Sequence, residues 1–79
     1  MSTRKIVVSA EQLSGAHIDE IVVFPWKFKS GVEATVRGQL RQIYHTSAEA
    51  VVNLCGIDEL TGDLSEFVLD RATRIEIEA

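Results

Sequence analysis

The sequence predicts an all-β fold, a small barrel of five to six strands with one short helical turn, formed by a single domain over residues 1–79. Apolar and polar residues alternate over ten positions from Val32 to Arg41, which is the period of a strand with one buried face. The other apolar segments are short and are separated by turn residues, and none of them has a long helical period. Short antiparallel strands of this kind close into a barrel to avoid exposed edges.

The first segment is predicted to be a short strand followed by one helical turn. Residues 6–8 are β-branched and flanked by polar residues. Ser9 and Gln12 have the spacing of a capping box, which indicates a helical turn that ends at Gly15. Residues 17–24 then predict a second strand.

Pro25 follows that second strand directly. Because proline has no N–H, its position is expected at a strand end, at a sheet edge or at a bend.

The long strand that begins at Val32 is predicted to bend. Its alternation breaks after Leu40, because Ile43 is out of phase, and a bulge near Arg41 would restore burial. Gly38 lies on the inner face, where the lack of a side chain permits strong curvature or close approach of another strand. We expect this strand to serve both halves of the barrel.

Three further elements complete the predicted sheet. Residues 50–55 are apolar on both faces, which indicates a central strand. Residues 64–69 form the next strand, and residues 70–73 allow only one turn before a final strand. Ile75 and Ile77 of the final strand are expected to point inward.

Composition favours a folded domain without an export signal or membrane segment. Hydrophobic residues make up 46% and charged residues 25% of the chain, and the apolar runs are far too short to span a bilayer. The apolar run after the N-terminal charges is also too short for a signal peptide. With a single cysteine, Cys55, no internal disulfide forms, and we expect a cytoplasmic protein.

Charge is divided unevenly along the chain. Residues 1–45 hold six basic and four acidic groups, whereas residues 46–79 hold two basic and eight acidic groups. The net charge of −4 is opposite to that of a generic nucleic-acid binder, which needs Lys and Arg to neutralise phosphates. The acidic half is a candidate surface for a basic partner.

The run from Val36 to Ile77 resembles the strand–strand–turn–strand core of SH3-like and Sm-like barrels. Within it, Leu64-x-Glu66-Phe67-x-Leu69-Asp70-Arg71 resembles the closing strand of WYL domains, which are Sm-like modules of bacterial regulators. The same segment is similar to the corresponding strand of the small Sm-like inhibitor of the Rho termination factor. The resemblance implies a small barrel with a regulatory role.

The chain departs from the WYL pattern at several points. It lacks the Trp-Tyr-Leu tripeptide, Ser65 replaces the usual Arg, and Ala72 replaces the usual Ile. The basic ligand-binding residues of WYL modules therefore have no counterparts here. As a whole, the chain resembles short proteins common in actinobacteria and their phages.

Catalytic, metal and cofactor chemistry are not predicted. His17, His45 and Cys55 are the obvious reactive side chains; His45 could reach Cys55 across a hairpin, but no flanking motif supports a catalytic pair or a zinc site. The acidic segment 58–63 lacks the ligand spacing of a calcium loop and is interpreted as a solvated hairpin loop. We expect no enzyme activity and no small-molecule substrate.

The best candidates for partner binding are aromatic and basic residues around the second and third strands. In an extended chain Trp26 shares the face of Phe24, so it either caps the barrel end or, if Pro25 turns the chain outward, anchors a partner. Basic residues interleaved with aromatics also hold single-stranded nucleic acid on small barrels. The candidate residues are Trp26, Lys27, Phe28, Lys29, Arg37 and Arg41.

We therefore expect a non-enzymatic protein-interaction or regulatory module, consistent with a phage protein that acts on a host protein. Its partner is another protein or a second copy of the chain. The alternative is an Sm-like nucleic-acid-binding barrel that forms oligomers.

Overall fold

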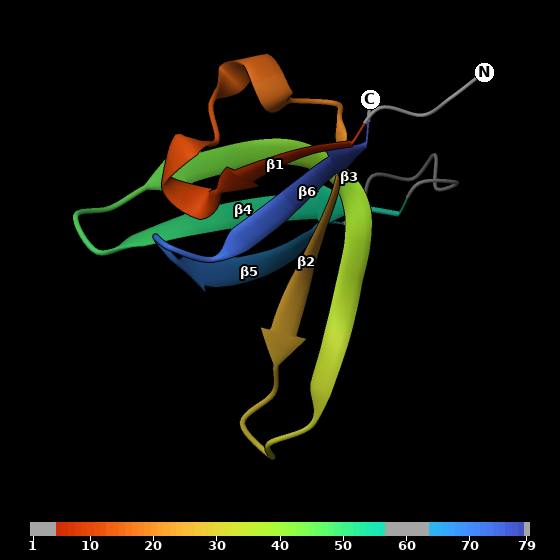
Figure 1. The fold of residues 1–79 in the computed structure, drawn as a ribbon, viewed down its shortest axis with the longest axis vertical. Helices are drawn as coiled ribbons and strands as arrows, with labels where there is room; N and C mark the ends of the chain where they lie inside the picture. Colours follow the sequence, from red (N-terminus) through yellow and green to blue (C-terminus); the bar gives the residue numbers. More distant parts are fainter. Residues whose placement is uncertain (1–4, 57–63, 79) are drawn as a thin grey trace.

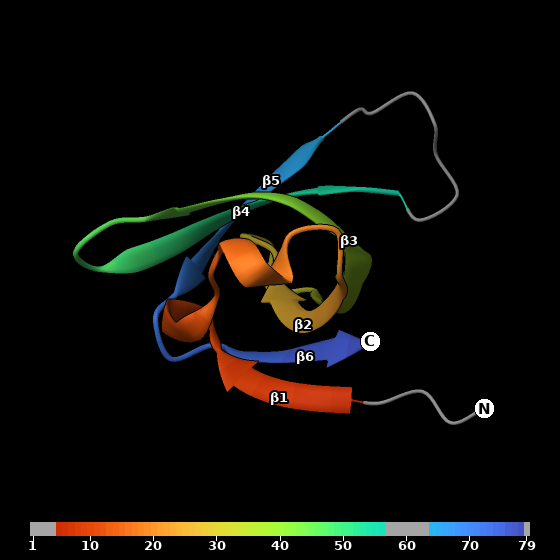
Figure 2. The same ribbon diagram turned by 90° about the horizontal axis from the view of Figure 1, so that it is seen from above.

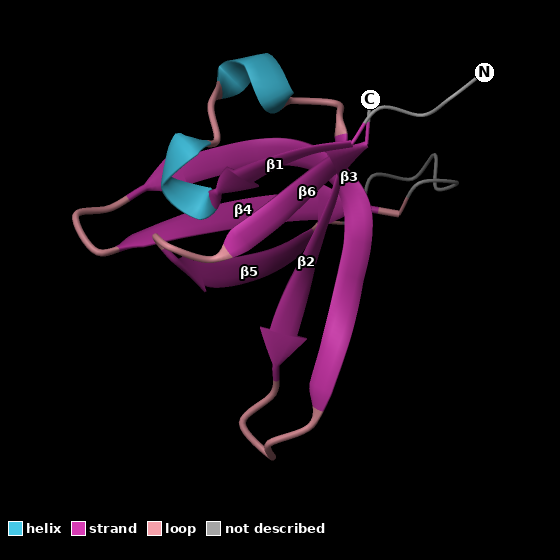
Figure 3. Cartoon of the chain, viewed as in Figure 1, coloured by secondary structure: helices cyan, strands magenta, loops and turns pink. Residues whose placement is uncertain are grey.

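The computed structural model describes residues 5–56 and 64–78, and in them six antiparallel strands form one sheet (Figures 1 and 3). The order across the sheet is β1-β6-β2-β3-β4-β5. The all-β prediction is confirmed. The strands are β1 (Lys5–Ser9), β2 (Ile21–Lys27), β3 (Glu33–His45), β4 (Glu49–Cys55), β5 (Ser65–Asp70) and β6 (Arg74–Glu78), and two 3₁₀ turns, η1 (Ala10–Gln12) and η2 (Gly15–His17), join β1 to β2.

The predicted closed barrel is not formed. The sheet curls around its interior, but β1 and β5 are its two ends and do not pair with each other (Figure 2). The reason lies in β6, which pairs with β1 on one side and with β2 on the other. Because both sides of β6 are occupied, β5 cannot close the sheet on β6; within the described residues β5 pairs only with β4, and β1 only with β6.

The connection from β1 to β2 differs from the prediction in its details. Gln12 Oε1 accepts the backbone N–H of Ser9 at 2.8 Å, so this half of the predicted capping box is present. The helical turn ends at Gln12, however, and Gly15 begins a second 3₁₀ turn that runs to His17. As a result β2 starts at Ile21 rather than at residue 17.

The predicted bend in β3 is confirmed. The pairing of β3 with β4 shifts register between Leu40 and Gln42, which leaves Arg41 as the bulged residue. A Cβ atom at Gly38 would lie 3.0 Å from the carbonyl oxygen of Cys55 and 3.2 Å from Leu54 Cβ. The absence of a side chain at this point therefore allows β4 to cross close to β3.

A hydrogen-bonded turn, not a helix, joins β5 to β6. Thr73 N donates to Asp70 O at 3.0 Å, and Ala72 N donates to the Asp70 carboxylate at 2.8 Å. The final strand follows the predicted alternation, since Ile75 and Ile77 are buried.

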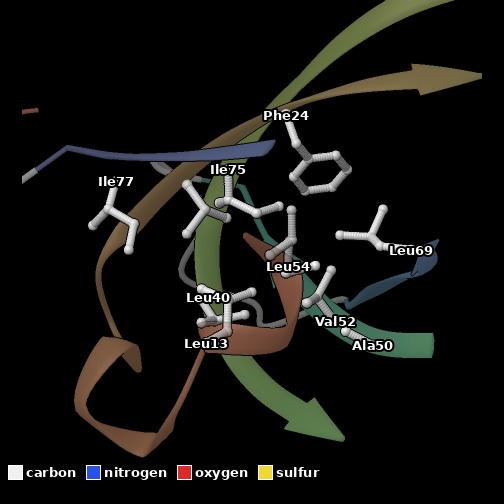
Figure 4. Packing of buried hydrophobic residues seen from close by; sticks show 11 residues of the cluster. Leu13, Phe24, Leu40, Ala50, Val52, Leu54, Leu69, Ile75 and Ile77 are labelled. Atoms are coloured by element: carbon white, nitrogen blue, oxygen red, sulfur yellow. The ribbon is translucent and has the colours of Figure 1, made fainter. Parts of the chain in front are cut away.

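The core lies inside the curl and draws on every strand except β1 (Figure 4). Two residues from the first 3₁₀ turn and its end, Ala10 and Leu13, cover one end of it. Its buried members are Ala10, Leu13, Val22, Phe24, Leu40, Ala50, Val52, Leu54, Leu69, Ile75 and Ile77.

The close contact at Gly38 predicts a large effect of Gly38→Ala. The added methyl group would press on backbone and side-chain atoms of β4, so we expect the free energy of unfolding to fall by about 1–3 kcal/mol in urea denaturation. Gly15→Ala is the matched control, because a Cβ there meets nothing within 4 Å and its effect should stay within about 1 kcal/mol. Equal effects at the two sites would contradict the close crossing.

Candidate interaction surface

The ends of β2 and β3 that are joined by the hairpin extend as a two-stranded ribbon away from the rest of the sheet (Figure 1). Residues 21–27 of β2 pair with residues 33–39 of β3, but β6 accompanies β2 only over residues 21–23. Beyond Val23, the side of β2 that faces β6 therefore has no strand neighbour in the part of the chain that the structure describes. At the hairpin tip, Phe28 N donates to Val32 O at 2.8 Å, and Gly31 has a φ of +91°.

Pro25 lies within β2, and the ribbon explains why it is tolerated. Hydrogen bonds from Phe28 N to Val32 O and from Leu40 N to Glu20 O show that even-numbered residues of β2 bond to β3. The nitrogen of Pro25 therefore faces the other side, where β6 has already separated. Of the three predicted settings, the sheet edge is the one observed.

One side of the ribbon is apolar, and its exposure increases toward the tip. Phe24 is buried, Trp26 is half-buried and Phe28 is 50% exposed. Across the hairpin, Ala34 faces Trp26 in the ladder, and Val32, opposite Phe28, is 58% exposed. We call these two exposed side chains, Phe28 and Val32, the tip pair.

Trp26 packs against the core, and Pro25 does not turn the chain outward before it. Its ring packs edge-to-face on Phe67 of β5, with centroids 4.9 Å apart, and Phe67 contacts Phe24 in the same way at 5.5 Å. Trp26 therefore extends the core at the base of the ribbon and remains partly accessible. Phe28 is the more exposed aromatic residue.

An open cleft of about 590 Å³ lies where β2 separates from β6. Trp26 and Lys27 line it from β2, Thr35 lines it from β3, and Thr73 and Arg74 line it from the start of β6. Sequence reasoning identified Trp26 and Lys27 but missed Arg74. No local pattern could have located Arg74, because the separation of β2 from β6 is a property of the sheet.

The structure does not bring Arg37 and Arg41 into this cleft. Arg37 makes two hydrogen bonds to the Glu78 carboxylate, at 2.8 and 3.2 Å, and Arg41 pairs with Asp19 at 2.8 Å. Both guanidinium groups thus face carboxylates of their own chain. The predicted set of cations is divided: Lys27 and Lys29 belong to the ribbon, and the two arginines to the body of the sheet.

Lys27, Lys29 and Arg74 differ from these two arginines. Within the described residues, none of the three has a carboxylate at ion-pairing distance. These three cations lie beside the tip pair or the cleft, next to exposed apolar side chains; Glu33, opposite Lys27 in the ladder, adds one acidic group to the cleft lining. Arg37 and Arg41, in contrast, are both paired with carboxylates.

His45 and Cys55 do not form a pair. They lie at opposite ends of the β3–β4 ladder, where His45 is opposite Ala50 and Cys55 is opposite Gln39. The possibility that His45 reaches Cys55 across a hairpin is therefore wrong.

Each of these side chains has another partner. His45 Nε2 lies 2.8 Å from Leu13 O, and the buried Cys55 thiol donates to Gln39 Oε1 at 3.5 Å. His17 Nδ1 accepts the backbone N–H of Ser14 at 3.0 Å. The described residues contain no group of three potential metal ligands, and the acidic segment 58–63 lies outside them.

The comparisons with known proteins leave the assignment to the geometry. No protein-family model, curated protein or solved structure matches the chain. In the part of the chain that the structure describes, no helix has the length and apolar character needed to cross a membrane.

The contact between Trp26 and Phe67 predicts unequal effects of two phenylalanine substitutions. Phe67→Ala removes the aromatic partner of Trp26 and of Phe24, so we expect the free energy of unfolding to fall by about 2 kcal/mol. Phe28→Ala should change it by less than about 0.5 kcal/mol, because that ring is exposed. Urea titration followed by the fluorescence of the single tryptophan measures both. Similar losses would mean that Phe28 is also packed.

The pair between Arg37 and Glu78 predicts a pH dependence of stability. The hydrogen bond from Arg37 lowers the pKa of Glu78 below its ordinary value of 4.5. Because the folded pKa is the lower one, the contribution is present above the unfolded pKa and is lost as pH falls through the folded pKa. We expect Glu78→Gln to lose stability relative to the wild type at about pH 7, with the difference shrinking toward about pH 3.

Unfolding in urea at several pH values measures this difference. Glu66→Gln serves as the control, since it removes a carboxylate without disturbing the contact with Arg37. A difference between wild type and Glu78→Gln that is constant with pH would contradict the assignment.

Proposed function

We propose that this protein is a non-enzymatic interaction module of the regulatory kind, and that it binds another protein through the end of the β2–β3 ribbon. The observation that carries the proposal is the tip pair, Phe28 and Val32, which is exposed directly beyond the end of the β2–β3 ladder and is joined by a backbone hydrogen bond. A hairpin presents such side chains at little cost in conformational entropy, because its backbone is already ordered.

The proposed partner has an apolar pocket with an acidic rim. Phe28 and Val32 fill the pocket, while Lys27 and Lys29 face the rim. Trp26 at the base of the ribbon provides further apolar surface and is held in place by Phe67. Aromatic residues at the centre of an interface with a polar rim are typical of protein-binding hot spots.

We also infer that the sheet is an open variant of the SH3-like or Sm-like barrel. Three features support this inference: the meander from β2 to β5, the strongly bent β3 and the short turn between the last two strands. The similarity of residues 64–71 to the closing strand of bacterial regulatory modules supports the regulatory role. The resemblance of the chain to short proteins of actinobacteria and their phages supports the proposal of a phage protein that acts on a host protein in the cytoplasm.

A second candidate is binding of single-stranded nucleic acid. The observation that favours it is that Trp26, Lys27 and Arg74 line one cleft, where a base could stack while its phosphates meet the cations. Glu33 in the same lining opposes phosphate binding there. The pairing of Arg37 and Arg41 with carboxylates weakens this candidate, because it removes cations from the phosphate path.

The proposal predicts loss of partner binding in the double variant Phe28→Ser/Val32→Ser. We expect a captured partner to bind about 30-fold more weakly, as for a hot-spot pair. Affinity purification from the source organism identifies the partner, and titration with the purified partner gives the affinity. Tyr44→Ser is the matched control, because it removes a 65% exposed aromatic ring from β3, outside the ribbon. Equal partner binding by the wild type, Phe28→Ser/Val32→Ser and Tyr44→Ser would refute the assignment of the binding site to the tip pair.

The nucleic-acid candidate has a separate test. Fluorescence anisotropy with single-stranded oligonucleotides should show negligible binding at physiological salt if the ribbon is a protein-binding site. Binding that weakens steeply with salt and is lost in Lys27→Glu/Lys29→Glu would favour the second candidate instead. Arg37→Glu/Arg41→Glu would have a comparable effect only if the paired arginines also face the ligand.

A further inference from the structure

Within residues 5–56 and 64–78, the two end strands of the sheet, β1 and β5, each have one side without a strand partner. In an antiparallel sheet, successive residues of a strand direct their N–H and C=O groups to opposite sides. Ala10 N donates to Thr73 O in the register that β1 keeps with β6, so the even-numbered residues of β1 bond to β6. The backbone N–H and C=O groups of Lys5 and Val7 therefore face outward. The carbonyl of Ser9 also faces outward, whereas its N–H is bonded to Gln12.

The same argument gives the outward groups of β5. Thr46 N donates to Glu49 O in the register of β3 with β4, so odd-numbered residues of β4 bond to β3 and even-numbered ones to β5. Their partners on β5 are its odd-numbered residues. Glu66 and Val68 therefore direct their backbone N–H and C=O groups toward the free side of β5, as does the N–H of Asp70, whose carbonyl oxygen accepts the N–H of Thr73.

We propose that the chain self-associates by antiparallel pairing of β1 in one copy with β5 in the next. A single register places the outward-bonding residues of the two strands opposite one another over the whole length of β1. Its hydrogen-bonded pairs are Lys5 with Asp70, Val7 with Val68, and Ser9 with Glu66, the second member of each pair belonging to the second copy.

Side-chain orientation agrees with this register. Ile6 and Val8 lie on the core side of β1, since they are paired with Ile77 and Ile75. In the proposed register they meet Leu69 and Phe67, which lie on the core side of β5. Ile6 is 50% exposed in the single chain, and the added strand would cover it.

Charge favours this pairing over the two symmetric ones. Lys5 lies opposite Asp70, whereas a β5–β5 pair centred on Val68 would place Glu66 opposite Asp70, and like charges directly opposite are destabilising. A β1–β1 pair centred on Val7 brings no opposite charges together and leaves the acidic β5 unpaired. Because the proposed contact joins two different surfaces, it generates rings or open-ended chains rather than a closed dimer.

The first test is the mass of the wild-type protein by size-exclusion chromatography with light scattering. An interface of one strand pair is small, so we expect assembly to be evident between about 10 µM and about 1 mM. The expected species is larger than a dimer. A monomer throughout this range would overturn the proposal, and it would leave the ribbon site untouched because that site shares no residue with β1.

Two charged variants at one position provide the matched comparison. Val7→Asp places a carboxylate between Glu66 and Asp70 of the neighbouring copy, so we expect assembly to weaken about tenfold or more. Val7→Lys adds a cation at the same place, and assembly should be retained or strengthened. If both variants abolish assembly, the β1–β1 pair is correct and the proposal is wrong.

Mixing of two proline variants tests which strands pair. Val7→Pro and Val68→Pro each remove an outward N–H and no hydrogen bond within the sheet, so both variants should fold. Urea unfolding followed by the fluorescence of the single tryptophan verifies that they do. Each variant alone should be monomeric, and the mixture should form a one-to-one dimer through the intact β5 of the first and the intact β1 of the second. Assembly of either variant alone would overturn the proposal.

Discussion

The bend in β3 is the constraint on which the rest of the structure depends. This strand pairs with β2 over residues 33–39 and with β4 over residues 39–45, so Gln39 is the point at which it changes neighbours. Gly38 allows β4 to approach at that point, and the bulge at Arg41 returns the apolar side chains to the interior. A straight strand of this length could not contribute Leu40 to the core and also support a projecting ribbon.

The ribbon follows from the same change of neighbours. Beyond the points where β4 separates from β3 and β6 separates from β2, the two strands continue as a pair, and no other described strand lies on either side. Their apolar face then passes gradually from core to solvent, from Phe24 through Trp26 to Phe28. Exposure of the tip is thus a consequence of the topology, and the aromatic contact with Phe67 keeps the base of the ribbon fixed relative to the core.

Charge is distributed in accordance with this division. On the body of the sheet, arginines are held by carboxylates distant in sequence, as in the contacts of Arg37 with Glu78 and of Arg71 with Glu11. The ribbon lysines and Arg74 have no such partner among the described residues. Exposed ion pairs of this type contribute little to stability, but they determine which cations remain available to a ligand.

The sequence by itself determined the local features of this protein. Side-chain alternation predicted the long strand, its loss of phase predicted the bulge near Arg41, and Gly38 indicated a close approach, because each of these depends on neighbouring residues and elementary sterics. The capping interaction of Ser9 with Gln12 and the inward direction of Ile75 were predictable for the same reason. Only the tertiary structure decided that the sheet stays open, that Trp26 rests on Phe67 and that His45 is far from Cys55. These outcomes depend on the registers of several strand pairs at once, and a register between distant segments leaves no signal in either segment alone.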